Sequence, residues 1–218
     1  MTEVQFRSDM GVELVDHMGS DQSVVRAARV STVGANEGQG GDRLIGYLMR
    51  EKHMSPFEHA TFTFLVEAPI FTINQMVRHR IASFNIESGR YKELEPVFYV
   101  PDLERPVVQV GKTGAYEFEQ GDMALHEKVQ TIQQNQSGLA WDAYVQQLKW
   151  GVAKEVARMV LPLNIYSSLY VTMNARGLMN FLRLRNEHHA QYEVRQVARQ
   201  MEDIFAEHMP LTHKAFRD

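Results

Sequence analysis

The sequence predicts an α/β protein of the α+β type, in which a mixed or antiparallel sheet is flanked by helices within one compact domain, residues 1–218. Residues 60–66 place Phe62, Phe64 and Val66 in alternation with other side chains, and this period of two indicates a strand. Elsewhere, apolar residues recur at helical spacing in several segments. Hydrophobic residues make up 44% and charged residues 23%, which is typical of a soluble globular chain.

Two elements are expected before that strand. The Gly-rich segment 34–41 predicts a flexible surface loop. Asp42 is expected to cap a helix whose apolar residues repeat at helical spacing over 44–49. This helix should end near His53, because Pro56 biases the residue before it away from helical angles.

The segment after the strand predicts a second helix and then a polar loop. Pro69 can open a helix with an apolar face over residues 70–77, and that helix is expected to run into residues 78–80. Residues 83–90 are polar and indicate an ordered loop. Residues 97–100 are apolar and bracketed by prolines, so they predict a short strand.

The remainder of the chain is mostly helical by its pattern. Residues 102–121 show little pattern, whereas residues 122–161 predict a long helix that is broken near Gly138 or Gly151. A further strand is expected over 166–172. Two last helices are marked by apolar residues at helical spacing, which are Leu178, Met179 and Leu182 in one, and Val194, Val197, Met201, Ile204 and Phe205 in the other.

Composition excludes several classes of function. The chain has no cysteine, which excludes disulfides, thiolate metal sites and every mechanism with a cysteine nucleophile. A net charge of −4 creates no global field for nucleic acid, so any anion site must be a local cluster of arginines. No apolar run approaches the ~18 residues that a membrane span needs, and no secretion signal is evident. We therefore expect a cytoplasmic protein.

The densest polar cluster spans residues 78–91 and holds three arginines within thirteen residues. On a continuous helix, Arg78 and Arg80 would lie ~200° apart and could not clamp one group. They could serve two ligands, or one ligand and a neighbouring subunit. Arg90 follows Ser88 and a glycine, and a hydroxyl, a freed backbone and a guanidinium together suit a phosphate. The alternative is a solvated basic helix end.

A second cluster covers residues 174–191. Asn174 is expected to cap the helix that follows it. Asn180 shares a helix face with both Arg176 and Arg183, because the spacings are four and three residues. Amides and guanidiniums on one face suit a heteroaromatic ring or a phosphate. The alternative is an exposed helix face.

The histidines suggest a metal site, but their spacing along the chain does not support one. Residues 53–59 carry two histidines with a carboxylate between them, but this fits no strong zinc pattern. The turn at Pro56 would also splay the side chains. His188 and His189 are adjacent, so they would not face one site on a helix. No metal site is predicted.

Arg78-His79-Arg80, followed by seven residues and then Ser88, resembles the signature of the flavin-dependent thymidylate synthases. Residues 34–41 and 101–145 show no match, but four further segments resemble the same family in the expected order. These are Ala28-Arg29-Val30-Ser31, residues 53–59, residues 158–162 and residues 174–191.

The resemblance implies an enzyme that performs the reductive methylation of dUMP to dTMP, with the fold described above. Methylenetetrahydrofolate supplies the carbon, and FAD reduced by NADPH supplies the hydride. The family forms homotetramers with active sites between subunits. Since this chain has no cysteine to add to the uracil ring, the pyrimidine must be activated electrostatically.

The resemblance also implies roles for individual residues. Arg185 would polarise the pyrimidine near N3, because an arginine stays protonated and donates two parallel hydrogen bonds, and His53 would sit near the flavin. The expected FAD contacts are Ser55, Arg78, His79, Arg80, Glu87, Asn174, Ala175, Arg176 and Asn180. The expected dUMP contacts are Gln75, Met76, Val77, Arg78, Glu87, Ser88, Gly89, Arg90, Arg158 and Arg185.

One position departs from the family pattern. Many relatives place an acidic residue directly after the asparagine that corresponds to Asn85, but here Ile86 stands there and Glu87 follows. Either Glu87 takes over that contact or the contact is missing. Two other hypotheses remain at this point, which are a catalytically silent nucleotide-binding regulator and, less favoured, a metal-dependent nucleotide hydrolase.

Overall fold

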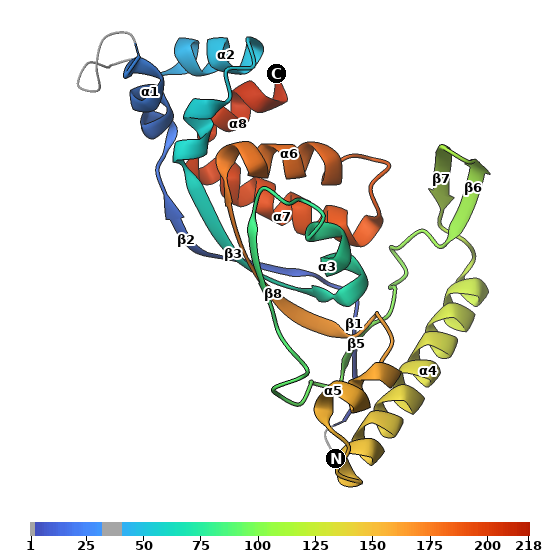
Figure 1. Cartoon of the computed structure of the whole chain (residues 1–218). Coiled ribbons are helices and arrows are strands. Elements are labelled where there is room, and N and C mark those ends of the chain that lie inside the picture. Colours follow the sequence, from blue (N-terminus) through green and yellow to red (C-terminus); the bar gives the residue numbers. More distant parts are fainter. Residues whose placement is uncertain (1–2, 32–40) are drawn as a thin grey trace. The chain divides into compact units, whose positions relative to one another are not determined.

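The computed structural model describes residues 3–31 and 41–218, so all of the predicted loop 34–41 except its last residue lies outside the described residues. Helices and strands are mixed along the chain, which confirms the predicted α/β class of the α+β type (Figure 1). The contacts divide the chain into two compact units. The first unit comprises Met1–Met10, Glu67–Gln75 and Ile86–Leu169, and the second comprises Gly11–Val66, Met76–Asn85 and Tyr170–Asp218. The single domain over residues 1–218 stays a prediction.

Eight strands and eight α-helices are present in the described residues. The strands are β1 (Gln5–Arg7), β2 (Gly11–Met18), β3 (Thr61–Pro69), β4 (Ser83–Ile86), β5 (Val97–Tyr99), β6 (Val108–Lys112), β7 (Ala115–Glu119) and β8 (Tyr166–Asn174). The α-helices are α1 (Asp21–Arg29), α2 (Asp42–Arg50), α3 (Ile70–Met76), α4 (Met123–Lys149), α5 (Lys154–Ala157), α6 (Ala175–Arg185), α7 (Tyr192–His208) and α8 (Pro210–Arg217). None of these described helices is long and apolar enough to cross a membrane.

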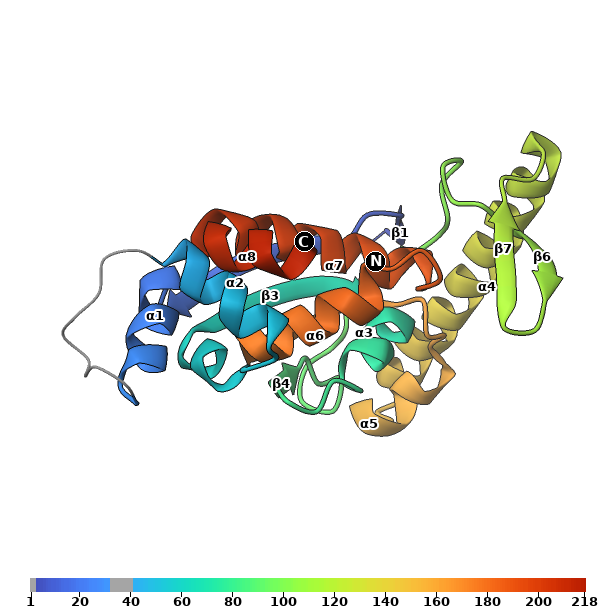
Figure 2. The same cartoon turned by 90° about the horizontal axis from the view of Figure 1, so that it is seen from above.

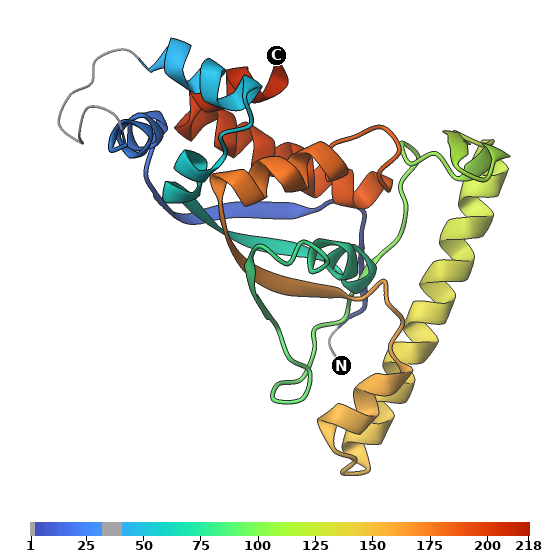
Figure 3. The same cartoon turned by 45° about the horizontal axis from the view of Figure 1, so that its top comes forward.

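The second unit is built on a sheet whose strand order is β2-β3-β8-β4. The predicted strand is confirmed as β3, and its alternation buries Phe62, Phe64 and Val66 completely. Helices α6 and α7 lie over one face of this sheet (Figure 3), and Phe205 of α7 meets Phe62 edge-on at a ring-centroid distance of 5.7 Å. Helices α7 and α8 pack against each other (Figure 2). The apolar stripe of α6 is thereby buried, and its polar side stays accessible.

The first unit has its own core around α4. Phe98, Trp141 and Tyr144 are buried together, and Trp141 contacts both of the other rings. Strands β1 and β5 pair in parallel, whereas β6 and β7 form an antiparallel hairpin. Asp122 caps α4 by accepting a hydrogen bond from the backbone N–H of Leu125 at 2.7 Å. The predicted long helix thus begins where expected.

Some predicted boundaries are wrong. Gly41, not Asp42, is the N-cap of α2, so Asp42 is the first helical residue. The polar segment 83–90 contains strand β4, which lies at the edge of the sheet beside β8. The break in the long helix falls at Gly151, whose φ of +80° is a left-handed angle, and Gly138 lies within an unbroken α4.

The most consequential correction concerns the end of α3. The helix was expected to reach residues 78–80, but it ends at Met76. The backbone N–H of His79 donates to the carbonyl of Met76 at 3.0 Å, which closes a turn in place of a continuing helix. The ~200° separation expected for Arg78 and Arg80 therefore does not apply. Both residues lie in the segment that follows α3.

Candidate active site

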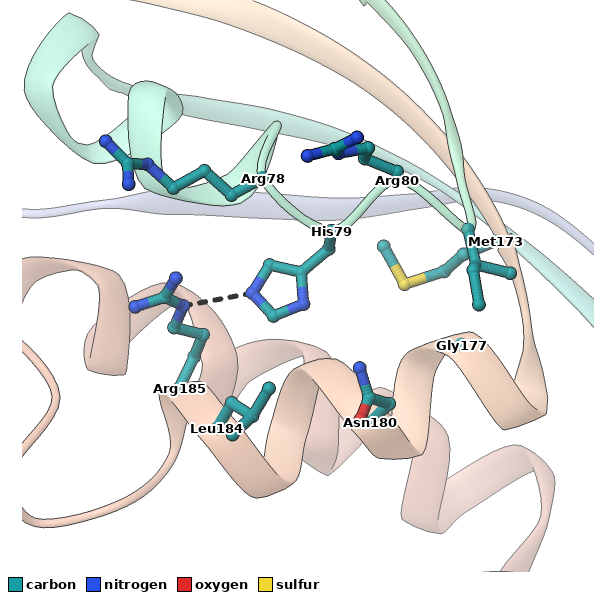
Figure 4. A pocket seen from close by; sticks show the side chains of 9 residues that line it. Arg78, His79, Arg80, Met173, Gly177, Asn180, Leu184 and Arg185 are labelled. Atoms are coloured by element: carbon teal, nitrogen blue, oxygen red, sulfur yellow. Dashed lines mark hydrogen bonds between the residues drawn. The ribbon is translucent and has the colours of Figure 1, made fainter.

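A pocket of about 410 Å³ lies in the second unit between the segment after α3 and helix α6 (Figure 4). Its lining combines guanidinium, imidazole, amide and apolar groups. The lining residues are Arg78, His79, Arg80, Ile81, Met173, Gly177, Asn180, Leu184 and Arg185. Five of the predicted site residues, namely Arg78, His79, Arg80, Asn180 and Arg185, are thus brought together, although they come from segments about a hundred positions apart.

Close packing at one glycine brings the two walls of the pocket together. A β-carbon on Gly177 would lie 2.9 Å from the backbone carbonyl oxygen of Ile81, so a larger residue would push the two segments apart. Asn174 caps α6 as predicted, since its side chain accepts from the N–H of Gly177 at 2.8 Å. The first turn of α6 is therefore fixed against the segment that carries the three signature residues.

The pocket is strongly cationic. Among the residues that the structure describes, its lining contains Arg78, Arg80 and Arg185 and no carboxylate. Burial, followed by the nearby charge of Arg78, lowers the pKa of Arg185, but an arginine remains protonated at neutral pH. Three guanidiniums gathered in one partly buried pocket favour an anionic ligand. Arg78 and Arg80 lie beyond the last residue of α3, Met76, and share the pocket with Arg185 of α6, so the three guanidiniums come from two separate segments.

His79 and Arg185 form a direct hydrogen bond within the pocket. The guanidinium Nε of Arg185 donates to Nε2 of His79 at 3.0 Å (Figure 4). Burial, and then the charge of Arg185, lower the pKa of His79, so the ring is neutral at pH 7. Because Nε2 accepts, the ring proton must be on Nδ1. The ring also packs edge-on against Phe181, with centroids 5.0 Å apart.

Asn180 directs a donor into the pocket. Its Oδ1 accepts from the Nη2 of Arg183 at 3.0 Å, which confirms that these two residues share a face of α6. The amide nitrogen is then on the opposite side, and Figure 4 shows it pointing toward His79 and Met173. Arg176 is outside the lining and instead pairs with Glu58, with Nη1 and Oε1 2.6 Å apart.

Other predicted residues of the second unit lie outside this pocket. His53 is exposed and meets the ring of Tyr47 edge-on at 5.9 Å. Ser55 is exposed at the start of a 3-10 helix, Ser55–His59. Ala175 is buried and donates its N–H to the carbonyl of Ala60 at 2.8 Å, and its FAD contact stays a prediction. Met76 is buried and Val77 is half-buried.

The predicted phosphate residues belong to the first unit, where some of them are adjacent. A β-carbon on Gly89 would lie 3.2 Å from the Cδ of Arg158, so these two residues touch. The carbonyl of Ser88 accepts from the N–H of Tyr91 at 3.1 Å, which forms the turn around Gly89. Arg90 donates through Nε to Glu155 at 2.8 Å, in an ion pair whose side chains are about half exposed.

Glu87 is engaged within the first unit. Its carboxylate pairs with Lys92, and this hydrogen bond raises the pKa of the Lys92 ammonium. Its N–H donates to the carbonyl of Ser168 at 2.9 Å. Gln75 is half-buried and is the last residue of α3 that belongs to the first unit. The residues thus fall into two sets, one in each unit.

Sequence reasoning missed the apolar part of the lining. Ile81, Met173 and Leu184 line the pocket but carry no chemical signal of their own. Ile81 and Leu184 could have been found as direct neighbours of Arg80 and Arg185. Met173, at 3% exposure, is buried like a core residue. The carboxylates Glu58 and Glu155, which pair with predicted arginines, were not anticipated.

The fold and this site define an α/β protein with a cationic pocket suited to an anionic ligand, and its relatives identify the family. The family model described as "Thymidylate synthase complementing protein" matches residues 13–211. Relatives with high similarity are flavin-dependent thymidylate synthases. The chain therefore belongs to the flavin-dependent thymidylate synthase family.

Three of these relatives show how complete the match is. The flavin-dependent thymidylate synthase of Tropheryma whipplei (strain TW08/27) is 48% identical, covering 97% of this chain and 93% of its own length. That of Thermotoga neapolitana (strain ATCC 49049 / DSM 4359 / NBRC 107923 / NS-E) is 48% identical over 94% of this chain and 89% of its own length. The crystal structure of the UMP/dUMP methylase PolB from Streptomyces cacaoi, bound with 5-Br UMP, superimposes with a TM-score of 0.93 at 47% identity, covering 98% of this chain and 96% of PolB.

Proposed function

We propose that this protein converts dUMP to dTMP by reductive methylation, with methylenetetrahydrofolate as carbon donor and FAD reduced by NADPH as hydride source. We also propose that it works in the cytoplasm as a homotetramer whose subunits share active sites. The observation that carries the proposal is the arginine pocket built from the Arg78-His79-Arg80 signature and α6. It occurs in a chain whose family is named for flavin-dependent thymidylate synthesis.

The residues of the pocket fit FAD. Three guanidiniums without a lining carboxylate suit a pyrophosphate. The amide nitrogen of Asn180 and the packed apolar side chains of Met173 and Leu184 suit a heteroaromatic ring. When bound, FAD supplies the hydride that reduces the transferred carbon to a methyl group. Arg78 and Arg80 would hold the cofactor's anionic part, and Asn180 would orient its ring.

The residues expected to contact dUMP have chemistry that suits its phosphate and its pyrimidine. Ser88, Gly89, Arg90 and Arg158 form a turn with guanidiniums beside it, which suits the phosphate. Arg185 would donate to the pyrimidine near N3 and stabilise the negative charge that develops on the ring. This activation replaces addition of a cysteine, which the chain lacks. A relative, PolB, has been crystallised with 5-Br dUMP.

The proposal is tested by measuring dTMP formation in complete and incomplete mixtures. Purified protein with dUMP, methylenetetrahydrofolate, NADPH and FAD should form dTMP under anaerobic conditions, as followed by chromatography. Omission of any one component should abolish the product. Tritium at C5 of dUMP should appear in water at the rate of dTMP formation, since C5 must lose its proton. Tight dUMP binding without dTMP under any reductant would instead identify a nucleotide-binding regulator.

A further inference from the structure

The hydrogen bond between Arg185 and His79 sets the direction in which the two terminal nitrogens of the Arg185 guanidinium point. The bond uses Nε of Arg185 and Nε2 of His79, which are 3.0 Å apart. Figure 4 shows the two terminal nitrogens of Arg185 on the side of the guanidinium away from the ring. A guanidinium is planar, so a bond at Nε sets the direction in which the terminal N–H groups point.

The imidazole itself is held in place. Phe181 packs edge-on against it with centroids 5.0 Å apart, and Phe181 is fully buried in the core of the second unit. The backbone N–H of His79 closes the turn to Met76 at 3.0 Å. Both the ring and its backbone are therefore anchored. His79 is a rigid support against which the long side chain of Arg185 rests.

The charges around His79 keep it in the accepting form. The groups that face the pocket from the segment after α3 are Arg78 and Arg80, and from α6 the facing charge is Arg185. Arg183 on α6 is engaged with Asn180. Every one of these charges is positive, and the lining residues in the described part of the chain include no carboxylate that would favour an imidazolium. A protonated ring could not accept from Nε, and it would repel the guanidinium.

We propose that His79 is a positioning residue, whose neutral imidazole orients the Arg185 guanidinium so that its terminal N–H groups address the pyrimidine of dUMP. This inference rests on the proposed function, because it uses the assignment of Arg185 to the pyrimidine. It gives His79 a task beyond the flavin contact that the family resemblance implies. To position Arg185, the side chain at residue 79 must offer a hydrogen-bond acceptor where Nε2 lies. In a neutral histidine, this requires the ring proton to be on Nδ1.

The first test examines the hydrogen bond itself without substrate. Protein labelled with ¹⁵N-histidine is studied by long-range ¹H–¹⁵N NMR at pH 7. We expect the His79 ring to be in the Nδ1–H form, with Nε2 unprotonated and accepting. An Nε2–H ring or an imidazolium at pH 7 would overturn the inference, whatever the activity of the enzyme.

The second test uses a pair of variants that differ in acceptor ability. His79→Gln places an amide oxygen near the position of Nε2, whereas His79→Leu offers no acceptor. By calorimetry on the FAD-loaded protein, His79→Leu should weaken dUMP binding about tenfold, as expected for one lost charged hydrogen bond, and His79→Gln should stay within about threefold of the parent. His17→Gln, at an exposed position on β2, is the matched control and should bind dUMP normally.

The pH profile separates positioning from a merely structural role. In the parent protein, dUMP binding should weaken as pH falls through the pKa of His79, and this acidic limb should be absent in His79→Gln. If both variants bind dUMP like the parent and lose only FAD, then His79 is a flavin contact alone and the inference is wrong. Absence of dTMP formation by the parent protein would defeat the proposed function instead, and the NMR result would still decide the His79–Arg185 pair.

Discussion

Glu202 ties the end of the helix that carries Arg185 to the rest of the second unit. It is buried on α7 at 7% exposure and accepts from Asn186 at 2.5 Å and from His213 at 2.8 Å. Arg217 also donates to both of its carboxylate oxygens. Burial by itself would raise the pKa of Glu202, but the hydrogen bonds from Arg217, His213 and Asn186 outweigh it and lower the pKa to about 2.

We predict that Glu202→Gln destabilises the protein strongly at neutral pH. The pKa falls from its ordinary value of 4.5 to about 2, and at about 1.4 kcal/mol per pKa unit this corresponds to about 3 kcal/mol. For a chain of this length, that loss should lower Tm by about 6–12 °C. A carboxylate with a lowered pKa stabilises the fold fully above pH 4.5 and loses this effect as the pH falls toward 2.

The assay is urea and thermal unfolding, followed by circular dichroism at pH 7, 5 and 3. The gap in unfolding free energy between parent and Glu202→Gln should be widest at pH 7 and should narrow at pH 3. Glu207→Gln is the control, because Glu207 is exposed on the same helix, and it should change stability by less than about 0.5 kcal/mol. A gap that is absent at pH 7, or that is equal at pH 3 and pH 7, would refute the reasoning.

Three further predictions concern the site. Arg185→Ala should keep FAD, but the activation free energy of dTMP formation should rise by on the order of 2–5 kcal/mol in a single-turnover assay. Near-normal turnover would mean that another arginine activates the pyrimidine. Arg90→Ala should raise the KM for dUMP more than it weakens FAD binding, and loss of FAD instead would rule out the phosphate assignment. Gly177→Ala should weaken FAD binding in a fluorescence titration, because its methyl group would lie 2.9 Å from the carbonyl of Ile81, whereas Gly138→Ala meets nothing within 4 Å and should bind FAD normally.

Elements whose structure depends on local pattern were predictable. Strand β3 could be predicted because apolar side chains alternate with others around Phe62 and Phe64. The same alternation places one face of the strand in the core. Helix α6 follows from Asn174 as its cap and from the spacing of Leu178 and Leu182. In these segments, local preference and tertiary packing favour the same conformation, so the sequence alone is sufficient.

Elements that depend on a distant partner were missed. Strand β4 exists because it pairs beside β8, and its polar side chains give no sign of this partner. The hairpin of β6 and β7 consists of two short, largely exposed strands, so its brief alternation is not reinforced by a buried face, and its turn depends on Gly114 with a φ of +87°. The early end of α3 was missed because its apolar spacing continues to Val77 although the turn at His79 closes the helix.

The site was predicted in its residue types but not in its pairings. The signature and the α6 cluster identified Arg78, Asn180 and Arg185, which the structure brings into one pocket. The partners of the other arginines could not be read from the chain. Glu58 lies 118 positions from Arg176, and Glu155 lies 65 positions from Arg90. Only the folded chain brings such pairs together.

The absorbance spectrum of the purified protein, recorded with added FAD before and after dUMP, tests the central claim most directly. The proposed function predicts absorbance bands at about 375 and 450 nm from protein-bound flavin. These bands should shift when dUMP is added, because the proposal places the flavin ring and the pyrimidine in one site. Protein that retains no flavin after incubation with FAD and gel filtration, or flavin bands that dUMP leaves unchanged, would contradict the account.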